Sequence, residues 1–169
     1  MTAQVPDRLM IGEQHHSLFT NPLEDYLERH PPRPPFMPRS TANWRGYVAL
    51  WTIDNERLYL IDISARFRTR VPGSNERGSR DVTLADLFPG AVGTLHAEWY
   101  SGTLRVPQGK LIDYVHQGYG SQYERFLLIE VSEGVVCDRR EIPGAPPRRG
   151  RAYSILDTLR SFASRLWRP

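Results

Sequence analysis

The segment from residue 114 to residue 124 is the part of this sequence whose side chains most suggest chemistry. A histidine, three tyrosines and a carboxylate surround two glycines there. Such segments form binding or catalytic loops, and they form ordinary turns equally well. The candidate side chains are Tyr114, His116, Tyr119, Tyr123 and Glu124.

The run Pro-Gln-Gly-Lys at residues 107–110 predicts a hairpin turn. The register of that hairpin sets Ser101 opposite His116 and places Arg105 and Tyr114 on the same face. We therefore expect a polar patch on one face of the sheet.

This patch has a catalytic interpretation. Ser101 could be a nucleophile with His116 as its base. Glu124 or Glu98 would then orient the imidazole. However, the G-x-S-x-G turn that exposes a nucleophile is missing around Ser101, and no pair of oxyanion donors is evident. Because serine and histidine are also common cross-strand neighbours, we favour a simple polar pair.

Arg105 supplies the main alternative, a site for an anionic ligand. A guanidinium fork beside aromatic rings can hold such a ligand, and His96, Glu98 and Tyr100 precede Arg105 closely in the chain. A small enzyme or ligand-binding domain would combine Arg105 with residues of the 114–124 segment, namely His116, Tyr119, Tyr123 and Glu124.

Trp44 and Arg45 have two interpretations. Tryptophan and arginine dominate the hot spots of protein interfaces, so the two residues could contact a partner. Trp44 also opens an apolar run that continues to Ile53 with period two. We favour the second interpretation, in which Trp44 begins a core strand.

Metal and cofactor sites are not indicated. His15 and His16 are adjacent, so on a strand they point to opposite faces and cannot readily share an ion. The sequence also lacks the metal-binding H-E-x-x-H motif, a phosphate-binding P-loop and a complete G-x-G-x-x-G. We therefore expect no metal and no cofactor.

Strands dominate the elements that must position these residues. Period-two apolar patterns between turn residues predict four hairpins, joined in sequence by antiparallel pairing. They pair residues 44–53 with 58–63, 94–106 with 111–116, 126–131 with 135–137, and 8–11 with 16–19.

Two short helical segments accompany the strands. Asn21 as cap and Pro22 at the first position predict a helix over residues 22–29. A loop over residues 71–80 precedes a single helical turn at 83–88. The expected fold class is α+β, mainly antiparallel β-hairpins forming one sheet or a partly rolled barrel.

The C-terminal end divides from this domain. Residues 1–142 form the expected single α+β domain, and residues 143–152 are a Pro/Arg-rich linker. Residues 153–167 carry apolar side chains at helical spacing and predict an amphipathic helix. The helix would dock on its own domain or on a partner, and peripheral contact with an anionic membrane surface is the rival expectation.

Composition limits the functional classes. With 169 residues, one core is the default, and the single cysteine, Cys137, favours a reducing compartment. The N-terminus lacks the apolar region of a signal peptide, so we expect a cytoplasmic protein. Arginine supplies 21 of the 22 basic residues, but the net charge of +3 is modest. An arginine-driven nucleic-acid binder is therefore our third hypothesis.

Several segments resemble a group of short uncharacterised bacterial proteins. They are Trp-Arg-Gly-Tyr at 44–47, Trp-Tyr-Ser-Gly-Thr-Leu-Arg-Val-Pro-Gln-Gly at 99–109 and the run from Tyr114 to Glu124. The resemblance implies no catalytic residues. Because such proteins are often partners of other proteins, including immunity proteins, our leading hypothesis is a non-enzymatic protein-interaction module.

Overall fold

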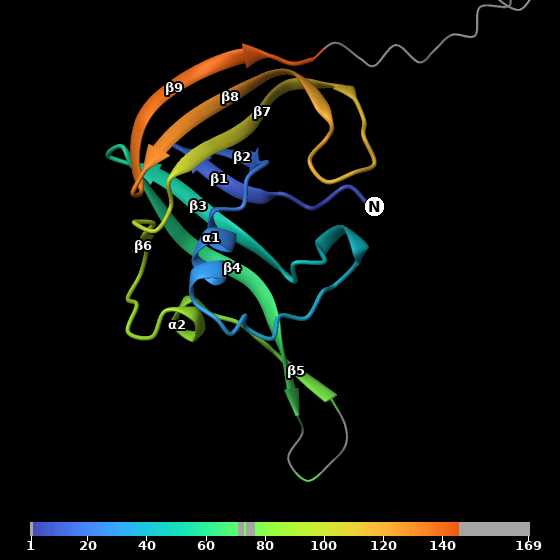
Figure 1. Ribbon diagram of the computed structural model, residues 1–169, viewed down its shortest axis with the longest axis vertical. Helices are drawn as coiled ribbons and strands as arrows, with labels where there is room; N and C mark the ends of the chain where they lie inside the picture. The colour runs from blue at the N-terminus through green and yellow to red at the C-terminus, as the bar shows by residue number, and fades with distance from the viewer. Residues whose placement is uncertain (1, 71–72, 74–76, 146–169) are drawn as a thin grey trace, which may run out of the picture.

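The structure is a computed structural model that describes residues 2–70, 73 and 77–145 (Figure 1). Two short α-helices and nine strands form it, with a 3-10 turn at Thr41–Asn43. The helices are α1 (Pro22–Arg29) and α2 (Leu84–Leu87). The strands are β1 (Asp7–Ile11), β2 (Gln14–Leu18), β3 (Tyr47–Asp54), β4 (Arg57–Arg70), β5 (Arg77–Asp81), β6 (Leu95–His96), β7 (Gly102–Asp113), β8 (Gln122–Ser132) and β9 (Val135–Pro143).

One mixed sheet contains all nine strands. Its main path runs β2-β1-β3-β4-β9-β8-β7, and β5 and β6 pair with β4 off that path. A mostly β structure with two short helices agrees with the expected α+β class. The expectation of purely sequential antiparallel pairing is wrong at two places on this path. Strand β1 lies parallel to β3, with Arg8 beside Leu50, and β4 is followed by β9. The crossover between β1 and β3 holds β2 and α1, which gives the chain the length that parallel pairing needs.

Three of the four predicted hairpins are confirmed, namely β1–β2, β3–β4 and β8–β9. In the β3–β4 turn, Asn55 and Glu56 both have positive φ, as a two-residue turn between twisted strands requires. Glu133 and Gly134 do the same between β8 and β9. Local turn chemistry therefore sets these registers.

The fourth predicted hairpin, at residues 107–110, is wrong. Strand β7 continues through the segment and pairs with β8, so that Arg105 faces Leu128 and Pro107 faces Phe126. The register shifts after Gln108, and Gly109 takes a φ of 76° where a bulge replaces the expected turn. Strand β7 ends the main path of the sheet, and an edge strand tolerates the missing amide of a proline.

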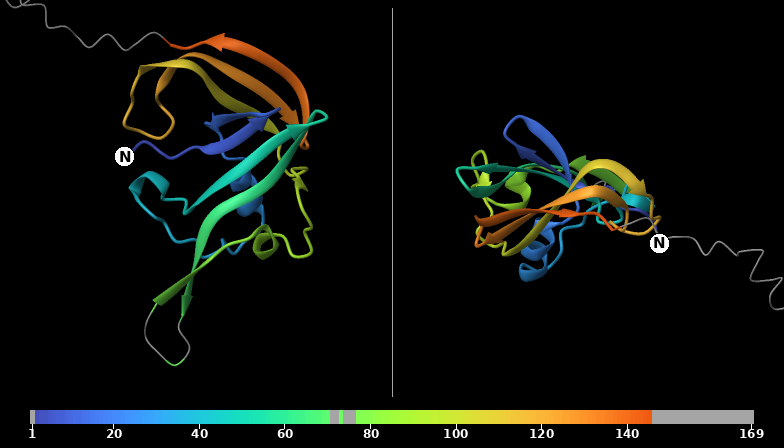
Figure 2. Two further views of the ribbon diagram at one scale, coloured as in Figure 1. Left: turned by 180° about the vertical axis from the view of Figure 1, so that it is seen from behind. Right: turned by 90° about the horizontal axis from the view of Figure 1, so that it is seen from above.

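The sheet curls until its two ends touch. Strands β7, β8 and β9 arch over β1, β3 and β4 (Figures 1 and 2). At one side β4 meets β9 at the single pair Arg57–Val135. At the other, Phe19 N, just after β2, donates to Arg105 O at 2.8 Å. The core between the two layers includes Trp51 and Leu104, both fully buried.

The helices cover the core where the sequence predicted them. Pro22 occupies the first turn of α1, and Leu23 and Leu27 are buried. The Asn21 side chain makes no capping hydrogen bond, which leaves its oxygen available to other partners. A capping box between Thr83 and Asp86 starts α2.

Strand β4 is longer than predicted, and part of the predicted loop at 71–80 is strand. Strand β5 pairs with the end of β4, from Arg66 opposite Asp81 to Arg70 opposite Arg77. The sequence of β5, Arg-Gly-Ser-Arg-Asp, has no apolar alternation. Because backbone hydrogen bonds rather than apolar burial define this strand, the pattern could not reveal it.

The C-terminal predictions lie mostly outside the described residues. Strand β9 extends through Pro143, and Gly144 N donates to Glu124 O at 2.9 Å, so the predicted linker begins as part of the sheet. The remaining linker and the predicted helix at 153–167 are beyond residue 145. Among the described residues, no helix has the length and apolarity needed to cross a membrane.

Candidate functional site

The three weak catalytic candidates do not come together. Ser101 precedes β7 and His116 follows it, so they lie beyond opposite ends of the β7–β8 ladder. At about 3.3 Å per residue, the β7 strand between them is roughly 35 Å long. Ser101 Oγ accepts from Glu133 N at 2.9 Å, and Glu124 Oε2 accepts from Lys110 N at 3.1 Å. His116 is exposed, and its Nδ1 lies 3.2 Å from the Tyr114 hydroxyl oxygen. The predicted nucleophile–base pair is therefore wrong, because it depended on the hairpin that β7 does not form.

The structure does bring Arg105, Tyr119 and Tyr123 together. The Arg105 guanidinium carbon lies 3.7 Å from the centre of the Phe126 ring, and Nη1 donates to Tyr119 O at 3.3 Å. Phe19 stacks on Tyr119 with ring centres 5.1 Å apart and meets Tyr123 edge-on at 5.8 Å. We call these five residues the Arg105 cluster.

The Arg105 cluster has a distinct electrostatic character. Burial lowers the pKa of Arg105, and no carboxylate forms a salt bridge with it among the described residues. Burial raises the pKa of Tyr119 to about 12, so its hydroxyl remains a donor at neutral pH. The cluster can therefore offer the Arg105 cation to an anionic group, with the Phe126 ring supporting the guanidinium.

Sequence reasoning missed Phe19 and Phe126 in this cluster. Phe126 was assigned to a strand, but its contact with Arg105 follows from the pairing of β7 with β8. Phe19 joins because the ends of the sheet meet. The other predicted neighbours of Arg105 lie elsewhere, since His96 pairs with Tyr59 on β4 and its ring contacts Glu98 and Gly134 O.

Arg45 is a buried structural residue, with 5% of its surface exposed. Its Nη2 donates to Val5 O at 2.9 Å and forms a salt bridge of 3.3 Å with Asp7. Its Nη1 donates to Asn21 Oδ1, which also accepts from the Tyr119 hydroxyl. In this geometry Arg45 cannot contact a partner directly, and it instead links β1, α1 and the 114–121 loop.

Asp7 is the fully buried anion of this pair. It accepts from Ala49 N at 3.0 Å and from Trp51 Nε1 at 3.2 Å, so its carboxylate binds β1 to β3. Burial raises the pKa of Asp7 to about 6, against the opposing effect of Arg45 and these hydrogen bonds. Asp7 therefore titrates close to the neutral range.

Trp44 does not begin a core strand. It ends the 3-10 turn and exposes 65% of its surface, because β3 starts only at Tyr47. Gly46, at a φ of 82°, lets the chain turn inward, and an added Cβ there would lie 2.8 Å from Phe36 Cβ. This turn puts the indole outside and Arg45 inside.

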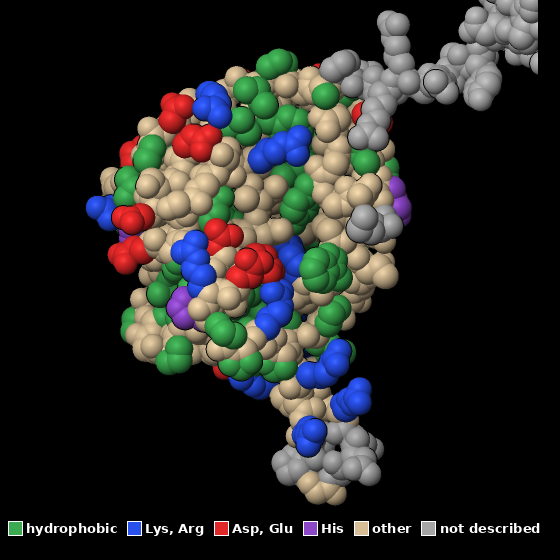
Figure 3. All heavy atoms as spheres, viewed as in Figure 1, with side chains coloured by type: hydrophobic (Ala, Val, Ile, Leu, Met, Phe, Trp, Pro, Cys, Tyr) green, Lys and Arg blue, Asp and Glu red, His purple; other side chains and the backbone are tan. Residues whose placement is uncertain are grey.

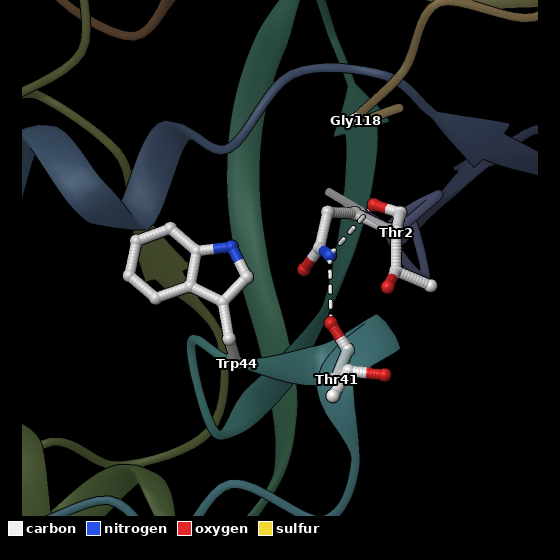
Figure 4. Close-up of a pocket in the computed structure, with 5 residues that line it drawn as sticks. Thr2, Thr41, Trp44 and Gly118 are labelled. Atoms are coloured by element: carbon white, nitrogen blue, oxygen red, sulfur yellow. Dashed lines mark hydrogen bonds between the residues drawn. The ribbon is translucent and has the colours of Figure 1, made fainter. Parts of the chain in front are cut away.

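The indole of Trp44 forms one wall of a pocket of about 370 Å³. Figure 4 shows Trp44 on one side of this space and Thr2 and Thr41 on the other. Gly118, from the 114–121 loop, completes the lining with Gln4. The Gln4 backbone N donates to Gly118 O at 3.0 Å. We call this space the Trp44 pocket.

Gln4 leaves one buried acceptor at this pocket. Its Nε2 donates to Thr2 O at 3.1 Å and to Thr41 O at 3.0 Å, which orients the amide. Its Oε1 is buried and has no hydrogen-bond partner among the described residues.

The Trp44 pocket and the Arg105 cluster share the loop between β7 and β8. Gly118 lines the pocket, and the next residue, Tyr119, stacks in the cluster. The loop is thus the element that positions both features. Two other depressions, near His96 and near Tyr59, lack an exposed tryptophan. Within the described part of the chain, no group of three or more His, Cys, Asp or Glu side chains could hold a metal ion.

Comparison with known proteins identifies no similar protein. No family model, curated protein or solved structure matches the chain. The resemblance of its segments to short bacterial proteins stays a prediction.

Proposed function

We propose that this chain is a non-enzymatic protein-interaction module whose binding surface is centred on the Trp44 pocket. The observation that carries the proposal is the 65% exposure of Trp44 at the wall of a preformed pocket. A large aromatic ring that is exposed in the free protein gives favourable binding free energy when a partner removes it from water. Tryptophan is also among the residues most enriched at hot spots.

The surroundings of the ring support this assignment. The pocket is built largely by backbone contacts, including Gln4 N to Gly118 O and Val5 N to Ala42 O at 2.7 Å. Behind it, the ion pair between Arg45 and Asp7 holds the adjoining segments. A rigid site of this kind loses little conformational entropy on binding.

A quantitative pull-down from the native host tests the proposal. The full chain would be compared with Trp44→Ala and with a control, Val92→Ala, which removes an apolar side chain that is 94% exposed and does not line the pocket. We expect partner proteins that the wild type and the control recover equally and that Trp44→Ala recovers at least tenfold less. Equal recovery by all three forms would overturn the proposal.

A second candidate function is the binding of a small anionic ligand at the Arg105 cluster. The guanidinium stacked 3.7 Å above Phe126, with no carboxylate salt bridge among the described residues, favours it. Thermal-shift titrations with inorganic phosphate and with adenosine monophosphate provide the test. Stabilisation that Arg105→Met abolishes would support a site there, and identical shifts in both proteins would exclude it.

A further inference from the structure

The hairpin of β4 and β5 is a basic arm on a described structure that is otherwise acidic. It projects beyond the body of the fold in Figure 1, and basic side chains gather along it in Figure 3. Residues 66–81 contain five arginines against one aspartate and one glutamate. The rest of the chain up to residue 147 contains 16 acidic and 11 basic residues. The charge of the described structure is therefore strongly asymmetric, although the whole chain carries only +3.

Among the described residues, two of the five arginines have side-chain partners. The Arg80 guanidinium forms a bidentate salt bridge with Asp86, in which Nη1 and Nη2 donate to the carboxylate at 3.0 and 2.8 Å. The same guanidinium lies over the Phe67 ring. Arg66 Nε lies 3.0 Å from Asp81 Oδ1. These contacts fix the base of the arm and neutralise its charge there.

The remaining arginines share the face that Arg66 occupies. Side chains alternate along a strand and cross-strand partners lie on one side, so Arg68, Arg70 and Arg77 point the same way. Arg70 lies directly opposite Arg77 in the ladder. Like charges at such a position destabilise a hairpin, so folding alone does not account for them.

The base of the arm is held by backbone contacts on the other edge of β4. Met37 N donates to Arg66 O at 2.8 Å, and Arg68 N donates to Pro35 O at 2.9 Å. The arm is thus a two-stranded ribbon presented from a firm base. A ribbon of this kind fits the major groove of B-form DNA, whereas the deep, narrow major groove of A-form RNA does not admit protein side chains.

We propose that the β4–β5 arm binds double-stranded DNA through its phosphates, with Arg68, Arg70 and Arg77 as the contacting side chains. Arginine matches phosphate geometry with its planar fork, and binding would relieve the repulsion between Arg70 and Arg77. The contacts are to the backbone of the DNA and carry no base preference. This activity is separate from the Trp44 pocket and does not depend on the function proposed for it.

Fluorescence anisotropy of the full chain with a 25-base-pair duplex, between 50 and 200 mM NaCl, tests the proposal. The arm variant replaces Arg68, Arg70 and Arg77 by glutamine. The control makes the same change in charge at Arg8, Arg39 and Arg57, which are exposed and lie outside the arm. Circular dichroism verifies that both variants fold.

We expect the arm variant to bind at least tenfold more weakly than the control. The slope of log K against log salt should be shallower by about 2 to 3, since each lost phosphate contact removes about 0.9. An equal loss in both variants would assign the binding to net charge and overturn the proposal. So would an unchanged arm variant, or binding to anionic vesicles or single-stranded RNA at the same affinity as to the duplex.

Discussion

Replacing Arg45 by methionine removes the cation that pairs with the buried carboxylate of Asp7. Methionine keeps much of the length and apolar volume of the stem, so the main change is the loss of charge and hydrogen bonds. Because Asp7 is fully buried, it cannot recover its hydration when the partner is lost. The substitution therefore leaves an uncompensated charge inside the protein at alkaline pH.

The magnitude follows from the geometry. Breaking a buried ion pair costs about 3–5 kcal/mol of unfolding free energy, and we expect this loss at pH 8. The pKa of Asp7, about 6, lies above its ordinary value of 3.8, so the folded state holds the proton more tightly than the unfolded state does. The unfolding free energy therefore rises as the pH falls from 8 to 5, by roughly 1 kcal/mol from this group in the wild type.

The variant should respond to pH more strongly than the wild type. Arg45 lowers the pKa of Asp7, so its removal raises that pKa further. While this pKa stays below 8, each added unit widens the difference in unfolding free energy between pH 5 and pH 8 by roughly 1 kcal/mol. We expect Arg45→Met to be much less destabilising at pH 5, where Asp7 is neutral in the folded protein.

Urea unfolding followed by tryptophan fluorescence at both pH values measures these free energies. Arg139→Met is the matched control, because Arg139 pairs with Glu56 at 2.9 Å on the surface. It should cost less than about 1 kcal/mol at either pH. A second variant, Asp7→Asn with Arg45→Met, should be more stable than Arg45→Met alone at pH 8. The reasoning is refuted if Arg45→Met costs under about 1 kcal/mol at pH 8, or the same amount at both values.

Three further predictions concern the backbone turns and the aromatic cluster. Gly46→Ala should lower the unfolding free energy by more than about 2 kcal/mol, because the new Cβ would lie 2.8 Å from Phe36 Cβ. The control Gly90→Ala has a similar φ and open space, so it should cost about 1 kcal/mol. Equal losses in urea melts would refute the role of the contact with Phe36. Glu133→Asn should stabilise by roughly 0.5 kcal/mol, since asparagine accepts the φ of 48° more readily, and a lower thermal midpoint would count against this turn assignment. Phe126→Ala should cost about 3–5 kcal/mol because the ring is 2% exposed, and a loss below about 1 kcal/mol in urea melts would contradict its burial.

Local sequence patterns predicted the elements whose register depends on neighbouring residues. The β3–β4 and β8–β9 hairpins form because short polar turns separate apolar runs of period two, and their residues accept positive φ. Helix α1 starts at Pro22 for an equally local reason. The same logic failed at residues 107–110, since a proline and a glycine suit a bulge in an edge strand as well as a turn.

The tertiary structure alone decided which segments far apart in the sequence meet. The parallel pairing of β1 with β3 rests on the carboxylate of Asp7, which accepts hydrogen bonds from Ala49 and Trp51 more than 40 residues away. The curl of the sheet brings Phe19 to Arg105, and neither residue carries a local signal for the other.

The neighbours Trp44 and Arg45 show this division most directly. Their types by themselves identified two residues capable of forming an interface. A positive φ at Gly46 and a buried anion from β1 then turned the arginine inward and left the indole in water. The sequence by itself therefore determined three of the four predicted hairpins and α1, through turn residues and a helix-starting proline a few positions apart. Which side chain became core and which became surface depended on long-range burial and charge pairing, and these exist only once distant strands have come together.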